Sequence, residues 1–183
     1  MTATADGLAP IPVTVENPEV WSELSTQLSA AEGMPTRLTL ETLCGMVGSA
    51  VPLQFAADAS GSADLLRGTF TDQVVAQAQR NIGRLREARP VSAEVRLVGV
   101  PIRDGRPELR IHITVASLAP DGDKVAVGEF WDLSSDNQAT VSTARCPSCG
   151  APLGLGQLIC DHCHSDARTV VTVPLAVSRM ELY

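Results

Sequence analysis

Four of the five cysteines of this chain lie in one short stretch, RCPSCGAPLGLGQLICDHCH, residues 145–164. They form two C-x-x-C pairs, Cys146 with Cys149 and Cys160 with Cys163, and ten residues separate the pairs. Each pair can form a tight knuckle, and two knuckles complete a tetrahedron of thiolates around one metal ion. The intervening GAPLGLGQLI is long enough for a strand, a turn and a return strand. The spacing therefore predicts a short zinc ribbon.

The predicted metal site has no open coordination position, because four cysteines fill the tetrahedron. Such a zinc ion is structural rather than catalytic. A module of this size buries too little apolar surface to fold alone, and metal binding worth about 10 kcal/mol or more can supply the missing stability. His162 lies inside the second pair and His164 follows it. Either could replace a ligand, but the complete set of four thiolates favours their interpretation as solvated neighbours.

Three alternatives to zinc remain open at the level of sequence. Iron can occupy the same four-thiolate cage. A C-x-x-C pair can also act as a thiol redox couple, although that role favours one pair at a helix N-terminus. CDHCH matches the haem-attachment pattern C-x-x-C-H, but that interpretation leaves Cys146 and Cys149 unexplained. We expect zinc.

Composition and charge restrict the compartment and the partners. The net charge is −7, and residues 1–61 contain seven acids against one base, so no basic footprint for phosphates is present. The beginning of the chain has no basic segment followed by an apolar one, and no apolar run approaches the ~20 residues that span a bilayer. We expect a cytoplasmic protein without a transmembrane segment, in which paired cysteines are metal ligands rather than disulfides.

The first half of the chain predicts helices. Residues 1–16 show no period and are expected to be a flexible or loosely docked tail. Residues 17–33 and 39–51 have apolar residues at helical spacing, and Gly45 and Gly48 in the second helix would allow another backbone to approach closely. Residues 52–64 are expected to be a loop, and a long helix is expected from Thr71 to the residue before Pro90.

The second half predicts an antiparallel meander. The segments 93–102, 108–118, 124–133 and 138–144 alternate in polarity and are separated by turn sequences, and residues 168–177 could add a strand. In ELRIHITV, apolar side chains point to one face, and Arg110, His112 and Thr114 point to the other. Helices followed by a sheet define an α+β fold. We expect a tail over 1–16, an α+β domain over 17–143, and the zinc ribbon with a C-terminal strand over 144–183.

The segment GEFWDL followed by RCPSCGAPL resembles a known arrangement. It is similar to bacterial relatives of the mitochondrial inner-membrane import-motor tether, and the resemblance covers roughly residues 62–164. The positions that carry it are Glu129, Phe130 and Trp131, with Cys146, Pro147, Cys149, Gly150, Ala151, Pro152 and Leu153. The resemblance implies a cone-shaped, nuclear-transport-factor-like domain with a curved sheet and a concave face, followed by a zinc ribbon. Arg110, His112 and Thr114 would be candidates to line that face.

The expected function is that of a non-enzymatic interaction or scaffold protein with a structural zinc ribbon, which binds a protein partner or a hydrophobic ligand. It is favoured because no catalytic constellation is recognisable. The first alternative is a small-molecule-binding protein or enzyme that uses the sheet cavity, with His112 or a nearby acid as a base. The second is a nucleic-acid-associated ribbon, which ranks last because residues 145–183 have three bases and three acids.

Overall fold

The computed structural model describes residues 8–30, 38–85, 88–135, 146, 148–151, 160, 162–165 and 175–182. Within these residues, the short strand β1 is followed by three α-helices and two short 3-10 helices, and then by the other strands. In chain order the elements are β1 (Val13–Val15), η2 (Pro18–Val20), α1 (Trp21–Ser29), α2 (Leu40–Ser60), η3 (Ala63–Leu66), α3 (Asp72–Arg80), β2 (Arg89–Gly99), β3 (Ile102–Arg103), β4 (Arg106–Pro107), β5 (Leu109–Leu118), β6 (Lys124–Ser135) and β7 (Leu175–Leu182).

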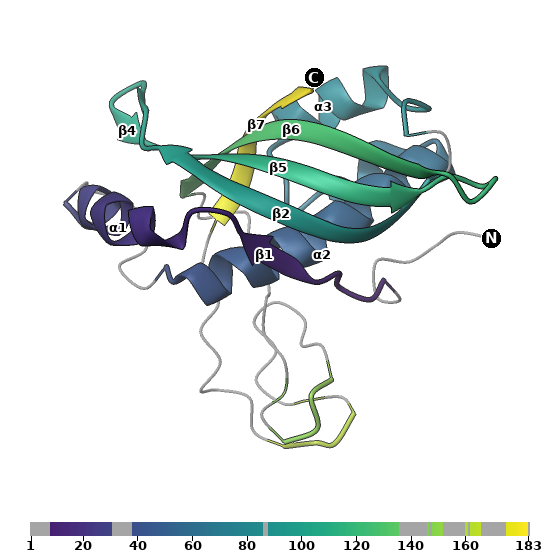
Figure 1. The fold of residues 1–183 in the computed structure, drawn as a ribbon, viewed down its shortest axis with the longest axis horizontal. Coiled ribbons are helices and arrows are strands. Elements are labelled where there is room, and N and C mark those ends of the chain that lie inside the picture. Colours follow the sequence, from purple (N-terminus) through teal and green to yellow (C-terminus); the bar gives the residue numbers. More distant parts are fainter. Residues whose placement is uncertain are drawn as a thin grey trace.

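A curved, open sheet of five strands forms the body of the molecule, in the order β1-β2-β5-β6-β7 (Figure 1). Strands β2, β5, β6 and β7 pair antiparallel, and β1 adds to β2 in parallel. Helix α2 crosses one face of the sheet, and α3 lies against the same side near β7. The expected mixture of helices with a curved antiparallel sheet is therefore confirmed, with one parallel edge strand as an addition.

The hydrophobic core lies between this inner face of the sheet and α2. Strand β5 alternates strictly, with Leu109, Ile111, Ile113 and Val115 buried and the residues between them at least partly exposed. Trp131 is fully buried opposite Ile111 on β6. The period-two pattern in the sequence therefore indicates the core face correctly.

Helix α2 is longer than its sequence pattern indicates. Residues 52–60, expected to be part of a loop, continue the helix through Pro52 to a left-handed Gly61. Buried residues occur all around this helix rather than along one stripe. Burial of that much apolar surface outweighs the roughly 3 kcal/mol that an internal proline costs a helix.

Pro52 leaves one carbonyl of α2 without its helical partner, and the N-terminal segment supplies a donor. The proline has no N–H, so the carbonyl of Gly48 is free to accept from the Ile11 amide, at 3.0 Å. A Cβ at Gly48 would lie 2.7 Å from the carbonyl oxygen of Ile11. The predicted close approach at Gly48 is therefore real. Residues 11–15, expected to be part of a loose tail, are docked, and Val13–Val15 form β1.

Helix α3 ends earlier than expected, at Arg80 rather than near Pro90. Gly83 has a φ of +89°, and the Asp58 carboxylate accepts from the amides of residues 83, 84 and 85. A carboxylate on α2 thus ends the helix by capturing these amides. Strand β2 then begins at Arg89, four residues before the expected start.

The remaining strand predictions agree with the described part of the chain. Strands β5 and β6 occupy the segments expected for them. The last strand, expected over 168–177, is β7 at Leu175–Leu182 on the edge of the sheet, so it overlaps the prediction only at residues 175–177, and residues 168–174 lie outside the described residues. The predicted strand over residues 138–144 lies outside the described residues, as do residues 152–159 between the two cysteine pairs.

Candidate metal centre

The four cysteines of the two C-x-x-C pairs meet in space. Their Sγ atoms all lie within 4.8 Å of one another. Cys146 Sγ lies 3.5 Å from Cys163 Sγ, and Cys149 Sγ lies 3.7 Å from Cys160 Sγ. A tetrahedral zinc ion with Zn–S bonds of about 2.3 Å requires sulfur atoms about 3.8 Å apart. The four thiols therefore fit one tetrahedral metal ion.

The two knuckles have the same backbone hydrogen bonds. In each, the first cysteine donates to the carbonyl five residues later, and the amide four residues later donates back to the cysteine carbonyl. The first knuckle uses Ala151 and Gly150, and the second uses Ser165 and His164, at 2.8–3.0 Å. The Ser148 amide also approaches Cys146 Sγ at 3.4 Å. The repeated C-x-x-C pattern thus folds into two equivalent half-sites.

His164 occupies the position that glycine holds in the first knuckle. Gly150 has a φ of +71° and His164 a φ of +57°, so both adopt the left-handed conformation that closes the knuckle. His162 and His164 are both exposed. The cluster that fits a metal contains the four cysteines without either histidine.

Hydrogen bonds and burial shift the pKa values of three of the four thiols in different directions. The Ser165 hydroxyl, with help from the Cys149 and Ser148 amides, lowers the pKa of Cys146 to about 6. Ser165 also lowers the pKa of Cys163. The Ala151 amide favours the Cys149 thiolate, but burial and the three other thiols outweigh it and raise that pKa to about 12. Binding of a divalent cation would release the remaining thiol protons, so that all four cysteines would be thiolates.

The proposed sheet-face residues lie away from both the metal centre and the core. Arg110, His112 and Thr114 alternate with buried residues on β5, so they occupy the outer face of the sheet, opposite α2. The His112 ring lies 4.9 Å from that of Phe130, and the Arg110 guanidinium lies 5.7 Å from the same ring. These residues form one partly exposed patch with Phe130.

Arg110 also has a structural role. It donates twice to the buried carboxylate of Asp132, at 2.6 and 3.0 Å, and once to Glu181, at 3.3 Å. Arg103 approaches the same Asp132 carboxylate at 3.3 Å. The hydrogen bonds to Asp132 raise the pKa of Arg110. Arg110 thus neutralises a buried charge in addition to facing solvent.

The sequence prediction missed one functional candidate, the carboxyl group of Glu129 on the inner face. Glu129 is 1% exposed and shares its face of β6 with Trp131 and Leu133. An acid in an otherwise apolar alternating face is the signal that could have identified it. Cys44, by contrast, is half-buried on α2, and burial raises its pKa, so it lacks the low pKa of a reactive thiol.

These features define a mixed helix-and-sheet protein with a four-cysteine cluster suited to a metal ion. Comparison of the chain with protein-family models, curated proteins and solved structures finds no match. Among the helices of the described residues, none combines the length and apolarity needed to cross a bilayer.

Proposed function

We propose that the chain is a non-enzymatic interaction protein in which a structural zinc ion fastens the two cysteine knuckles beside a nuclear-transport-factor-like domain. The single observation that carries the proposal is the meeting of four thiols at tetrahedral spacing. Because cysteine fills every position, the ion has no site for a substrate. Its role is to hold the backbone of the two knuckles in a fixed shape.

Metal analysis of the purified chain tests the zinc assignment. We expect one zinc ion per chain, with Cys146→Ser, Cys149→Ser, Cys160→Ser and Cys163→Ser each losing it. Cys44→Ser is the matched control, since Cys44 is the fifth cysteine and lies on α2 outside the cluster. Visible absorption distinguishes iron, which is coloured in a four-thiolate site, from colourless zinc. No stoichiometric metal in the wild-type chain would contradict the proposal.

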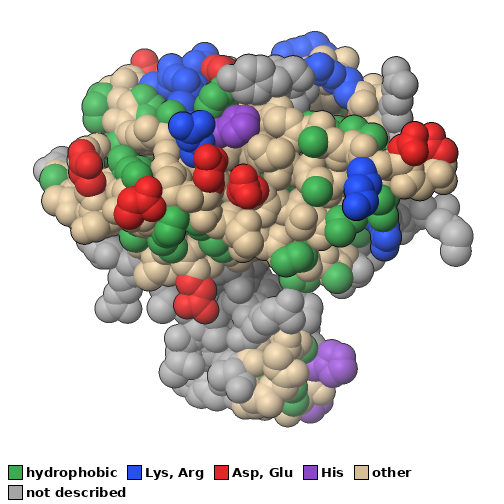
Figure 2. Space-filling view, in the orientation of Figure 1, with side chains coloured by type: hydrophobic (Ala, Val, Ile, Leu, Met, Phe, Trp, Pro, Cys, Tyr) green, Lys and Arg blue, Asp and Glu red, His purple; other side chains and the backbone are tan. Residues whose placement is uncertain are grey.

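The outer face of the sheet is the proposed surface for a protein partner. Arginine and aromatic residues are enriched in protein interfaces, and Arg110, His112 and Phe130 lie together there. Figure 2 shows acidic, basic and hydrophobic side chains interspersed on the face in view, without one large field of a single sign. This mixture favours a protein over nucleic acid as the partner.

Site-specific crosslinking tests this surface. A photo-reactive residue at Thr114, on the outer face of β5, is expected to give a discrete crosslinked product in cells. The same residue at Gln27, which is exposed on α1, is expected to give none. A product from position 27 together with no product from position 114 would place the interface elsewhere.

A further inference from the structure

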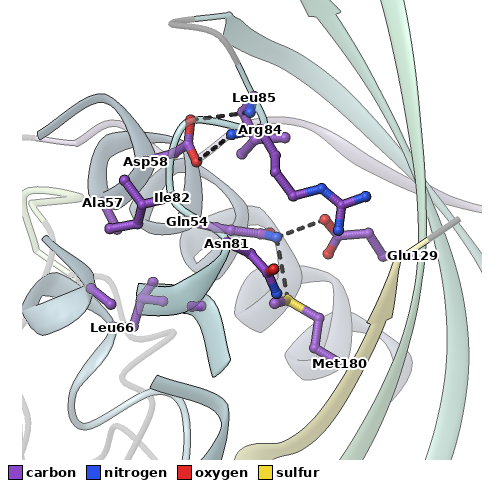
Figure 3. A pocket seen from close by; sticks show the side chains of 12 residues that line it. Gln54, Ala57, Asp58, Leu66, Asn81, Ile82, Arg84, Leu85, Glu129 and Met180 are labelled. Carbon is purple, nitrogen blue, oxygen red and sulfur yellow. Dashed lines mark hydrogen bonds between the residues drawn. The ribbon is translucent and has the colours of Figure 1, made fainter. Parts of the chain in front are cut away.

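A small pocket opens between the inner face of the sheet and the helices. It has a volume of about 40 Å³ and lies where α2, η3 and the turn after α3 approach β6 and β7 (Figure 3). Its wall is mainly apolar. The hydrophobic side chains that line it are Ala57, Ala63, Leu66, Ala78, Ile82, Leu85 and Met180.

Two buried polar side chains lie at the inner end of the pocket, and Asn81 adds a half-buried polar side chain to the lining. Glu129 reaches it from β6 and Gln54 from α2, and they are 1% and 7% exposed. Gln54 Nε2 donates to Glu129 Oε1 at 2.6 Å and also contacts Met180 Sδ at 3.3 Å. The Trp131 indole N–H donates to the other carboxylate oxygen at 2.8 Å. Two protein donors therefore fix the orientation of the buried carboxyl group.

The inner end of the pocket retains capacity to accept hydrogen bonds. Gln54 Oε1 is buried and has no hydrogen-bond partner among the described residues. Each oxygen of Glu129 accepts one of the bonds above, and a carboxylate oxygen can accept two. A buried acceptor without a donor is costly, so this end of the pocket favours a group that donates several hydrogen bonds.

The charged groups around the pocket also favour a ligand that donates hydrogen bonds. Burial raises the pKa of Glu129, while the donors Trp131 and Gln54 and the more distant Arg84 oppose that rise. Asp58 on the pocket wall already accepts three backbone amides, as Figure 3 shows for two of them. Arg84 is exposed at the rim. Among the described residues that line the pocket, Glu129 is therefore the acid at the inner end, and a bound cation would add to the positive charge of Arg84 in compensating its burial.

We propose that this pocket binds a small primary amine, with its ammonium group held by Glu129 and Gln54 Oε1 and its short alkyl part packed against Ala57, Leu66 and Ile82. An ammonium group has three donors and no acceptor. In a site lined by acceptors, all of its hydrogen-bonding groups can therefore find partners. A hydroxyl group brings one donor and its own acceptors. The pocket has room for about three or four water-sized groups, which matches an amine of three carbons. The assignment does not depend on the metal centre.

The Trp131 indole N–H is a direct reporter of the site, because it donates to the carboxylate that would bind the amine. We would follow its NMR signal in a Trp21→Phe background while n-propylamine is added at constant pH and ionic strength. A ligand of this size can bind only weakly, so a saturating shift with a midpoint of about 1 mM is expected. n-Propanol, the neutral molecule of the same size, is expected to bind at least ~10-fold more weakly.

Two variants separate the polar and steric contributions. Glu129→Gln removes the charge and is expected to abolish the response to n-propylamine, and Glu181→Gln, on neighbouring β7, is the matched control that keeps it. Ala78→Leu fills the pocket without changing its polar end and is expected to abolish binding even if Glu129→Gln fails to fold. An unchanged indole signal up to ~50 mM amine would mean that the pocket holds water only and would overturn the proposal. Equal binding of n-propanol, or amine binding retained in folded Glu129→Gln, would overturn it as well.

Discussion

At the scale of single residues, the same side-chain type has different roles according to what surrounds it. Glu129 is buried among apolar side chains and accepts from Trp131 and Gln54, whereas Glu181 is exposed beside Arg110. His112 and His164 differ in the same way, because one lies against an aromatic ring on the sheet and the other closes a knuckle with a left-handed backbone. The consequences of changing these residues therefore follow from their contacts.

Glu129 makes the stability of the chain depend on pH. Its pKa is higher in the folded chain than in the unfolded chain, so the folded state binds the proton more tightly. The contribution to the free energy of unfolding is therefore greatest at pH values below the unfolded pKa and is lost as pH rises through the folded pKa. Arg84 and Asp58, the charged groups beside the pocket, are present in all variants compared.

We expect Glu129→Gln to remove this dependence. Relative to the wild type, the variant should gain stability as the pH is raised from about 4 to about 8, which urea unfolding at several pH values would measure. Glu181→Gln provides the comparison for an exposed acid. If the wild type instead becomes more stable relative to Glu129→Gln as the pH rises, the folded chain stabilises the ionised form of Glu129.

His164→Gly tests whether His164 is a ligand or a backbone element. Glycine adopts a positive φ without the cost of about 1 kcal/mol that a side chain incurs, although it also loses more entropy on folding. We expect zinc affinity, measured by competition with a chelator, to stay within about threefold of the wild type. Cys163→Ser, one residue earlier, should lose more than ~100-fold. A comparable loss in His164→Gly would make the histidine a ligand.

At the scale of elements, α2 and β1 depend on each other. Pro52 removes a helical donor, Gly48 has no side chain to block the approach, and the Ile11 amide fills the vacancy on the Gly48 carbonyl. Residues 11–15 can then lie against α2 and pair with β2. An interruption in the helix pattern thus becomes the docking site of an edge strand.

Gly48→Ala should destabilise the domain although alanine is the better helix former. The new methyl group would clash with the Ile11 carbonyl, and the cost of overpacking minus the gain in helix propensity leaves a loss of about 1–2 kcal/mol. Gly45→Ala, at a half-buried position one turn earlier in α2, is the matched control. Chemical denaturation would measure both. A Gly48→Ala variant as stable as Gly45→Ala would mean that β1 is not held at this contact.

At the scale of the whole molecule, the four-cysteine cluster and the sheet are separate parts of the structure. The knuckle residues lie apart from the sheet, beyond α2 in Figure 1. Strand β7 follows them in sequence but belongs to the main sheet, where Val177 and Met180 are buried. Val177 also exchanges backbone hydrogen bonds with Thr69 and Thr71, at 3.1 and 3.0 Å. Strand β7 is thus held in the sheet by burial of its apolar side chains and by backbone hydrogen bonds.

Removal of the metal should therefore affect only one of these regions. In Cys146→Ser, or after chelation, we expect the amides of Gly150 and His164 to exchange rapidly with solvent, since metal binding supplies the stability of the knuckles. The amides of β5, β6 and β7 should remain protected, and the main thermal transition should change little. Loss of protection across the sheet would show instead that the knuckles are part of the main core.

Local pattern was sufficient for several features. Only ten residues separate the two cysteine pairs, so the chain can readily bring them together. The sequence therefore predicts the four-cysteine cluster that the structure shows. The alternation of residues 109–115 assigns one face to the core, because side chains in a strand point alternately to opposite faces. The outer position of Arg110, His112 and Thr114 follows from the same geometry.

Other features arise from contacts between distant parts of the chain. Gln54 and Glu129 are 75 residues apart, and neither position alone indicates the hydrogen bond that joins them at the inner end of the pocket. The continuation of α2 through Pro52 depends on burial all around the helix and on a donor from Ile11. Short-range periodicity determines which way a side chain points. The energy that keeps a proline in a helix or an acid in the core comes from apolar burial and hydrogen bonds with residues far away in the sequence.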